Sequence, residues 1–311
     1  MIVVSVVIFC VVLLLYLHIM FHLKVSDDLD VYDLGIIDKN KLETACNLRQ
    51  PLKFKCLFPA LREVLTIEAM ERDHSNQTVN VINTDDNSIL PLRLKKALDL
   101  FNNSKTDAYH SMDNSSFIGL AGLTKAFASG DVHLKPSLTV STKYDLIWSS
   151  NGGSSRLGYT LDYRNYYYVT QGKCVIRLFP PSTEQLNCTP DYSRFEFMSP
   201  INPFVPNEKY RSALEQCRYT DVFLEENDTM FIPPYWWHAI KLVDACCLAV
   251  HRYSTIMSSL SVAPHLLRHV LQRHSVVFTP AHVIPTAEKL EHSLDSTKIE
   301  KHSQRKDTNN E

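Results

Sequence analysis

The first 23 residues constrain what this chain can fold into more than any other segment. Residues Ile2 to Leu23 form an apolar run that carries no formal charge. At about 1.5 Å of helix rise per residue, the run can cross the roughly 30 Å hydrocarbon core of a bilayer. A cleavable signal peptide has an apolar core of only about 7 to 15 residues. We therefore predict an uncleaved transmembrane anchor over residues 1–23.

Charge near the anchor does not set the orientation of the remaining chain. Besides the α-amino group, Lys24 is the positive charge near the run, and acidic residues count for little in the positive-inside rule. Five N-x-S/T triplets follow the anchor, at Asn76, Asn102, Asn114, Asn187 and Asn227. Such triplets are glycosylation acceptors in secreted proteins. We expect a type II single-pass protein of the endoplasmic reticulum or Golgi, with a glycosylated lumenal body.

The eight cysteines agree with an oxidising lumen but do not indicate a metal site. Cys10 lies in the predicted anchor, and the other seven contain no C-x-x-C pair, so neither a zinc ribbon nor a thioredoxin-type site is indicated. Connectivity cannot be read from sequence. The two disulfides that we predict join Cys46 to Cys56 and Cys188 to Cys217.

Composition places the remaining chain among folded proteins, with 45% hydrophobic and 21% charged residues. The net charge of -2 and the lack of a basic block argue against nucleic-acid binding. Residues 24–60 are predicted to be a stem leading into a domain over 61–285, and residues 286–311 a disordered tail. In the α-rich N-terminal flank of the domain, Leu90–Phe101 has apolar residues at helical spacing.

From Leu138 onward the pattern changes to short segments rich in Tyr, Val, Ile and Phe between turn residues, which is typical of strands. A turn at Gln171-Gly172 separates two of them, and a helix over Leu260–His274 follows the last. The strand spacing favours a sandwich or barrel over alternating βαβ units. The predicted strands are Tyr144–Ser149, Tyr166–Thr170, Cys174–Phe179, Thr220–Leu224, Met230–Ile232, His238–Val243 and Cys246–Tyr253.

Two stretches carry the most specific information. The first, Gly152–Pro181, contains N-x6-G-K-x4-L-F-P-P starting at Asn165, and the second, Ser199–Ile240, contains F-I-P-P-Y-W-W-H ending at His238. In this order they resemble the cupin-like branch of the JmjC hydroxylases, typified by the asparaginyl hydroxylase of hypoxia-inducible factor, over about residues 140–255. The resemblance implies a mainly β fold, a double-stranded β-helix (cupin/JmjC barrel) with flanking helices.

The resemblance also assigns an iron site. His238 matches the distal iron ligand, although a His beside two Trp residues is by itself more often structural. The other two ligands, a His and a carboxylate, stand six and four residues before the Asn that matches Asn165. Those positions hold Tyr159 and Leu161, which do not supply them. Asp162 is one position late, so strand alternation points it away from the metal unless a bulge intervenes.

The co-substrate position has changed as well. Where the hypoxia-factor hydroxylase has a Lys for the distal carboxylate of 2-oxoglutarate, this chain has Cys174, and Lys173 falls one place earlier on the other face. We interpret Cys174 as a small buried hydrophobe. His251 stands where the family often has Asn on the final core strand. Facing His238 across the barrel, it would give a two-His pair without a carboxylate.

These departures predict a non-catalytic binding or scaffold module that keeps the barrel and uses neither iron nor 2-oxoglutarate. Its partners would be the membrane and a lumenal protein. An alternative is an Fe(II)/2-oxoglutarate-dependent hydroxylase of secretory-pathway proteins that uses His238 with Asp162. A third hypothesis is a cupin that binds a different metal through His238 and His251.

Overall fold

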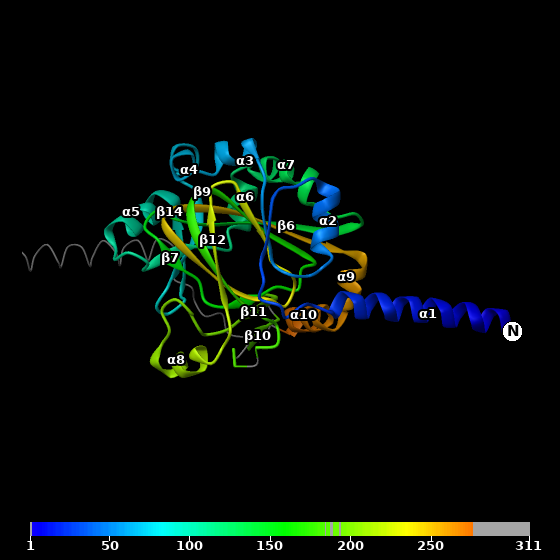
Figure 1. Cartoon of the computed structure of the whole chain (residues 1–311). Coiled ribbons are helices and arrows are strands. Elements are labelled where there is room, and N and C mark those ends of the chain that lie inside the picture. Colours follow the sequence, from blue (N-terminus) through cyan, green and yellow to red (C-terminus); the bar gives the residue numbers. More distant parts are fainter. Residues whose placement is uncertain (1, 184, 187–188, 193, 276–311) are drawn as a thin grey trace, which may run out of the picture. The chain divides into compact units, whose positions relative to one another are not determined.

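The structure, a computed structural model, describes residues 2–183, 185–186, 189–192 and 194–275 (Figure 1). The predicted tail therefore lies outside the described residues. The helices are α1 (Ile2–Leu23), α2 (Lys39–Cys46), α3 (Pro59–Val64), α4 (Ile67–His74), α5 (Leu94–Asn103), α6 (Ser115–Leu120), α7 (Thr124–Leu134), α8 (Glu208–Glu215), α9 (Ile256–Ser261) and α10 (Ala263–Ser275). The strands are β1 (Tyr32–Ile36), β2 (Leu52–Lys55), β3 (Thr78–Asn83), β4 (Ile89–Arg93), β5 (Tyr109–Ser111), β6 (Thr139–Ser149), β7 (Gly153–Ser154), β8 (Gly158–Tyr159), β9 (Arg164–Phe179), β10 (Thr189–Asp191), β11 (Glu196–Met198), β12 (Thr220–Glu225), β13 (Asp228–Phe231) and β14 (Trp237–Thr255).

Two facing layers of strands form the double-stranded β-helix that the resemblance implied. The first layer has the order β6, C-terminal half of β14, N-terminal half of β9, β13. The second has the order β8, N-terminal half of β14, C-terminal half of β9, β12. The first layer is extended by β2 and β1 beyond β13, and by β5, β3 and β4 beyond β6. The mainly β fold with flanking helices is thus confirmed.

The two long strands β9 and β14 contribute to both layers, which the sequence did not predict. The predicted turn at Gln171-Gly172 is wrong, as is the predicted division of β14 after Val243, because each segment continues as one strand through a bulge. Gly172 has φ +77°, and a Cβ on it would lie 2.1 Å from the carbonyl oxygen of Ala245. The absence of a side chain therefore lets the two strands stay paired while they bend from one layer into the other.

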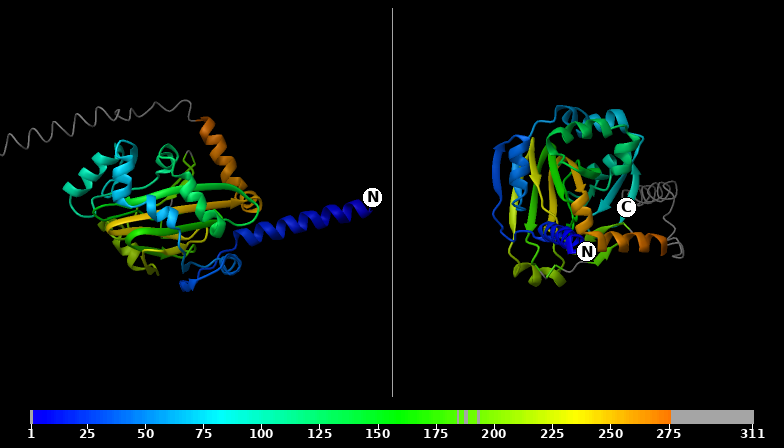
Figure 2. Two further views of the ribbon diagram at one scale, coloured as in Figure 1. Left: turned by 90° about the horizontal axis from the view of Figure 1, so that it is seen from above. Right: turned by 90° about the vertical axis from the view of Figure 1, so that its right-hand side faces the viewer.

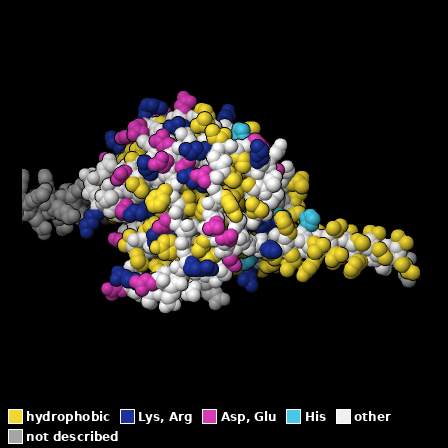
Figure 3. Space-filling model, in the orientation of Figure 1, with side chains coloured by type: hydrophobic (Ala, Val, Ile, Leu, Met, Phe, Trp, Pro, Cys, Tyr) yellow, Lys and Arg dark blue, Asp and Glu magenta, His cyan; other side chains and the backbone are white. Residues whose placement is uncertain are grey.

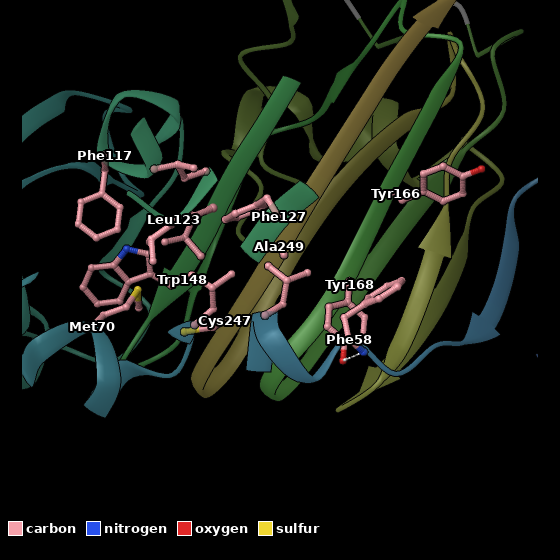
Figure 4. Packing of buried hydrophobic residues seen from close by; sticks show 14 of the residues in the cluster. Phe58, Met70, Phe117, Leu123, Phe127, Trp148, Tyr166, Tyr168, Cys247 and Ala249 are labelled. Atoms are coloured by element: carbon pink, nitrogen blue, oxygen red, sulfur yellow. Dashed lines mark hydrogen bonds between the residues drawn. The ribbon is translucent and has the colours of Figure 1, made fainter. Parts of the chain in front are cut away.

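Alternate residues along these strands face two different cores. Tyr166 and Tyr168 of β9 and Cys247 and Ala249 of β14 face the helical side (Figure 4). Their neighbours Tyr167, Val169, Leu248 and Val250 face the space between the layers. Helices α3, α4, α6 and α7 contact the strands of the first layer and cover its outer face (Figure 1). This alternation decides which side chains can reach a site inside the barrel.

Trp236 and Trp237 end the F-I-P-P-Y-W-W segment, and their side chains are 0% and 6% exposed. The second joins a separate cluster with Phe179 and Leu157 at one end of the barrel. Both rings therefore contribute to the packing of the fold.

Two local predictions near the N-terminus are wrong. The segment Leu90–Phe101 is not one helix, because Ile89–Arg93 pairs with β3 as an edge strand and α5 begins only at Leu94. Cys46 and Cys56 are both free, with the Cys46 sulfur 3.5 Å from the hydroxyl of Tyr166. Cys188 lies outside the described residues, so its pairing with Cys217 stays a prediction. Further along, the predicted helix over Leu260–His274 corresponds to the end of α9 followed by α10.

Helix α1 is the helix among the described residues that is long and apolar enough to cross a membrane. None of its described residues is buried, and its last turn meets the body, where His22 is half-buried. The geometry is compatible with a single-pass anchor.

The bend between the layers can be tested through its glycine. Gly172→Ala should lower the free energy of unfolding by about 2 to 4 kcal/mol, since it adds a clash to a φ that side chains rarely adopt. As a control, Gly119→Ala in α6 meets nothing within 4 Å and should change stability by less than about 1 kcal/mol. Urea unfolding of both variants measures the difference, and equal stabilities would contradict this role of Gly172.

Candidate functional site

A cavity of about 290 Å³ opens between the two layers at the β8 end of the barrel. Four of the residues predicted for the site line it, namely Tyr159, Leu161, Asp162 and His238. Asn165 is fully buried next to it, and Cys174 and His251 are buried elsewhere. Residues that sequence reasoning missed also line the cavity, including His110, Tyr167 and Arg252.

His238 is the second residue of β14 and lies opposite Gly158, and both of its ring nitrogens have partners. Nδ1 lies 3.1 Å from the carbonyl oxygen of Trp236, which can only accept, so Nδ1 donates. Nε2 lies 2.7 Å from the hydroxyl of Tyr167 and accepts from it. Burial lowers the pKa of His238 to about 4. A neutral ring with its lone pair engaged by a hydroxyl is therefore the state near pH 7.

Tyr167 occupies the place that a metal would need beside His238. Its hydroxyl accepts from Nδ2 of Asn165 at 3.2 Å while it donates to His238. Burial raises the pKa of Tyr167 above its ordinary value, so the hydroxyl keeps its proton. The sequence could have placed Tyr167 in the site, because it lies two positions after Asn165 and so shares the same face of β9.

The two remaining ligand positions have become part of the packing. Tyr159 stacks on Phe197, with ring centroids 5.1 Å apart, and meets the Trp237 ring edge-on at 4.8 Å. Leu161 is 5% exposed and packs in a cluster with Phe197 and Val262. Aromatic and aliphatic contacts thus hold both side chains where a His and a carboxylate would be needed.

Asp162 does not point away from the site, as strand alternation had predicted. Strand β8 ends at Tyr159, so the alternation rule does not apply to a residue in the following loop. Asp162 lines the cavity, and its Oδ1 accepts from Nζ of Lys143 at 3.3 Å and from Oγ of Ser254 at 3.0 Å. Its carboxylate is therefore already paired.

The expected pair of His238 and His251 is wrong. The two positions differ by an odd number of residues and the side chains face opposite sides of β14. His251 donates from Nε2 to the carbonyl oxygen of Phe127 at 3.1 Å, and its ring packs against Tyr144 on the helical side. The neighbouring residue, Arg252, is the one that reaches the cavity.

Arg252 is one of the cations that line the cavity. Its guanidinium lies 4.0 Å from the carboxylate of Asp145, and its Nε has no hydrogen-bond partner. Burial and the neighbouring Asp113 raise the pKa of Asp145 to about 6. The charged residues that line the cavity itself are mixed in sign: Lys143, Arg156, Arg194 and Arg252 against Asp113, Asp162 and Glu196.

Cys174 lies in the core between the layers, 1% exposed, and does not line the cavity. A hydrogen bond with the thiol of Cys246 and burial raise the pKa of Cys174 well above its usual range, so it is a protonated thiol. Lys173 points outward and pairs with Glu225 at 2.7 Å. The position of the co-substrate lysine therefore offers no cation to a carboxylate.

Within the described part of the chain, no group of three or more His, Cys, Asp or Glu side chains is placed to hold a metal ion. The residues at the family site do not fit a facial triad, since only His238 is of the required type and its Nε2 is bonded to Tyr167. The fold and site define a class: a double-stranded β-helix domain with a cavity open between its two layers.

A family model described as a cupin-like domain matches residues 62–255, and the chain belongs to that family. A comparison with curated proteins gave no significant sequence match.

The glycosylation acceptors differ in accessibility. Asn76 and Asn102 are exposed, and Asn227 is half-buried in the turn between β12 and β13. Asn114 is 1% exposed, and its Nδ2 donates to Oγ of Ser111 and to the carbonyl oxygen of Leu146. The prediction of a glycan on Asn114 is therefore wrong for the folded protein. Asn187 lies outside the described residues.

Acidification tests the buried state of His238. Because burial lowers its pKa from 6.5 to about 4, the unfolded chain binds more protons than the folded protein between those values. Stability therefore falls as the pH drops through this window. His238→Gln keeps an acceptor for the hydroxyl of Tyr167. On acidification its free energy of unfolding should fall by about 2 to 3 kcal/mol less than that of the unchanged protein.

The same change at the exposed His133 is the control. Urea unfolding at pH 7 and pH 4 gives the comparison. Asp145, whose pKa burial raises, acts in the opposite direction in both proteins and cancels in the difference. An unaltered pH dependence in His238→Gln would contradict the buried neutral histidine.

Proposed function

We propose that this protein is a membrane-anchored cupin-like binding module whose body lies in the secretory lumen and which uses neither iron nor 2-oxoglutarate. One observation carries the proposal: the 2.7 Å hydrogen bond that engages Nε2 of His238 with the hydroxyl of Tyr167. A nitrogen lone pair that accepts this bond is not available to a metal. Binding, rather than oxidation, is the chemistry that such a cavity supports.

The cavity supports a binding role by its size and lining. At about 290 Å³ it is near the lower end of small-molecule sites, so it suits one side chain of a protein partner or a small polar ligand. Three polar atoms of residues that line it are buried without a partner: Nε of Arg252, Oγ1 of Thr160 and Nδ1 of His110. Buried polar groups usually have partners, so a ligand that supplies them would be stabilised.

The hydroxylase alternative requires several changes at once. His238 would have to give up the hydrogen bond from Tyr167, and Asp162 would have to leave both Lys143 and Ser254. Even then, a His and a carboxylate make two of the three protein ligands. Each released partner would be left less well paired in a buried site, which is costly.

Metal content tests the proposal. The purified protein should hold substoichiometric iron, and added Fe(II) with 2-oxoglutarate should leave its melting temperature unchanged, since a ligand stabilises only a fold that binds it. Elemental analysis and thermal unfolding are the measurements, with Asp162→Ala as the comparison variant. Stoichiometric iron in the unchanged protein that disappears in Asp162→Ala would establish the hydroxylase instead.

Topology has a separate test. Glycosidase treatment of membrane fractions should increase the gel mobility of the protein, and Asn76→Gln should remove one glycan step because that side chain is exposed. Asn114→Gln should leave the number of glycans unchanged but lower stability by about 1 to 3 kcal/mol, since the longer amide breaks buried hydrogen bonds. A body that carries no glycan and is digested by protease outside sealed vesicles would place the domain in the cytosol.

A further inference from the structure

A set of exposed apolar side chains gathers at the end of the body that adjoins α1. These side chains are between 42% and 74% exposed and come from the start of β6, from α9 and from α10. We call them the anchor-side patch: Leu138, Val140, Ile256, Leu260, Leu267, Val270 and Leu271. A contiguous apolar surface on a soluble domain commonly marks an interaction site.

Helix α10 contributes the largest share of the patch, and its two faces differ. The inner face meets the β10–β11 segment, where Nδ1 of His265 lies 3.0 Å from the hydroxyl of Tyr192 and Leu266 joins the neighbouring cluster. The outer face carries Leu267, Val270 and Leu271 at i, i+3 and i+4 spacing, which form one exposed stripe. Two exposed arginines, at positions 268 and 273, accompany the stripe.

The base of α1 is fixed to the body beside this patch. The guanidinium of Arg49 donates to the carbonyl oxygens of His22 at 2.6 Å and Lys24 at 3.1 Å, and it stacks over the ring of Phe21 at 4.4 Å. These bonds use carbonyl groups that the end of a helix leaves without intrahelical partners. Helix α9 contacts α1 directly. The direction of α1 is therefore coupled to the surface around its base.

The patch is arranged around the base of α1 rather than along it. Helix α10 runs across the direction of α1 in both views of Figure 2. The backbone N–H of Ile256 donates to the carbonyl oxygen of Leu138, which places the start of β6 next to α9. Figure 3 shows the hydrophobic surface of α1 continuing onto the adjoining edge of the body. With α1 along the membrane normal, α10 would thus run obliquely across that normal, beside the base of α1.

We propose that the anchor-side patch lies on the surface of a phospholipid bilayer, with α10 as an interfacial helix beside the anchor. The inference rests on the insertion of α1 that the proposed function includes. An amphipathic helix with basic residues buries its apolar face about 5 to 10 Å into the headgroup boundary. Leu267, Val270 and Leu271 would enter that layer, and Arg268 would meet lipid phosphates. Lipid is the favoured occupant because the patch continues the surface of the anchor.

This contact would also hold one wall of the cavity at the membrane. The ring of Phe195 lines the cavity and packs against His269 of α10, with centroids 5.3 Å apart. The hydroxyl of Tyr192, in the same segment, receives a hydrogen bond from Arg268 at 3.3 Å. Docking of α10 on lipid would therefore restrain the segment that bounds the cavity and place the cavity close to the bilayer.

Quenching of a new tryptophan by lipid tests the inference in the full chain. Leu267→Trp is made in the full-length protein, which is reconstituted into phosphatidylcholine and phosphatidylserine vesicles with or without bromine on the acyl chains. The three native tryptophans are at most 6% exposed and provide a background to subtract. We expect brominated lipid to remove most of the added emission and plain lipid to shift that emission to shorter wavelength.

The matched control is Val205→Trp. Val205 precedes α8 in the chain, and α8 lies away from α1 in Figures 1 and 2. Val205 is 58% exposed and Leu267 is 60% exposed, so the two side chains have nearly the same exposure to solvent before lipid is added. Emission from the control should be unaffected by bromine.

The outcomes separate the two proposals. If alkaline carbonate releases the protein from the vesicles, α1 is not inserted and the proposed membrane anchoring fails. If the protein is retained and Leu267→Trp is not quenched, the anchoring stands and the interfacial role of α10 is wrong. A shift to shorter wavelength without quenching, together with a crosslinked dimer, would assign the patch to a second copy of the chain and would equally overturn the lipid contact.

Discussion

The antiparallel pairing of β9 (Arg164–Phe179) with β14 (Trp237–Thr255) runs through both layers of the barrel, and the other barrel strands attach to it on either side. The pairing bends where Gly172 passes the backbone of Ala245. Its side chains then alternate between the helical core and the space between the layers. The cavity, its polar groups and the clusters that close it all take their positions from this one ladder.

The same ladder also brings together the polar side chains inside the barrel. Tyr167 and His238 lie on the two paired strands, and their hydrogen bond joins side chains that would otherwise be buried polar groups without partners. Tyr159 and Leu161 gain aromatic and aliphatic contacts at positions where a metal would need ligands. Side-chain packing therefore stabilises this part of the barrel.

The anchor and the body are also mechanically related. Arg49 fixes the end of α1, and α9 contacts α1 directly. The body therefore has defined contacts with the end of α1, and Phe195 in the cavity wall packs against His269 of α10.

The sequence by itself determined the long apolar N-terminal helix and the mainly β fold, because length, strand pattern and residue type are local properties. Alternation along one continuous β14 separates His238 from His251, which the predicted division of this segment into two strands had concealed. Tertiary structure alone decided that the hydroxyl of Tyr167 bonds to His238 and that Arg252 faces the cavity. It also placed Asp162 in a loop, where its carboxylate accepts hydrogen bonds from Lys143 and Ser254. It also buried Asn114 and joined four predicted strands into two. These features depend on contacts between segments far apart in the chain, which no local pattern records.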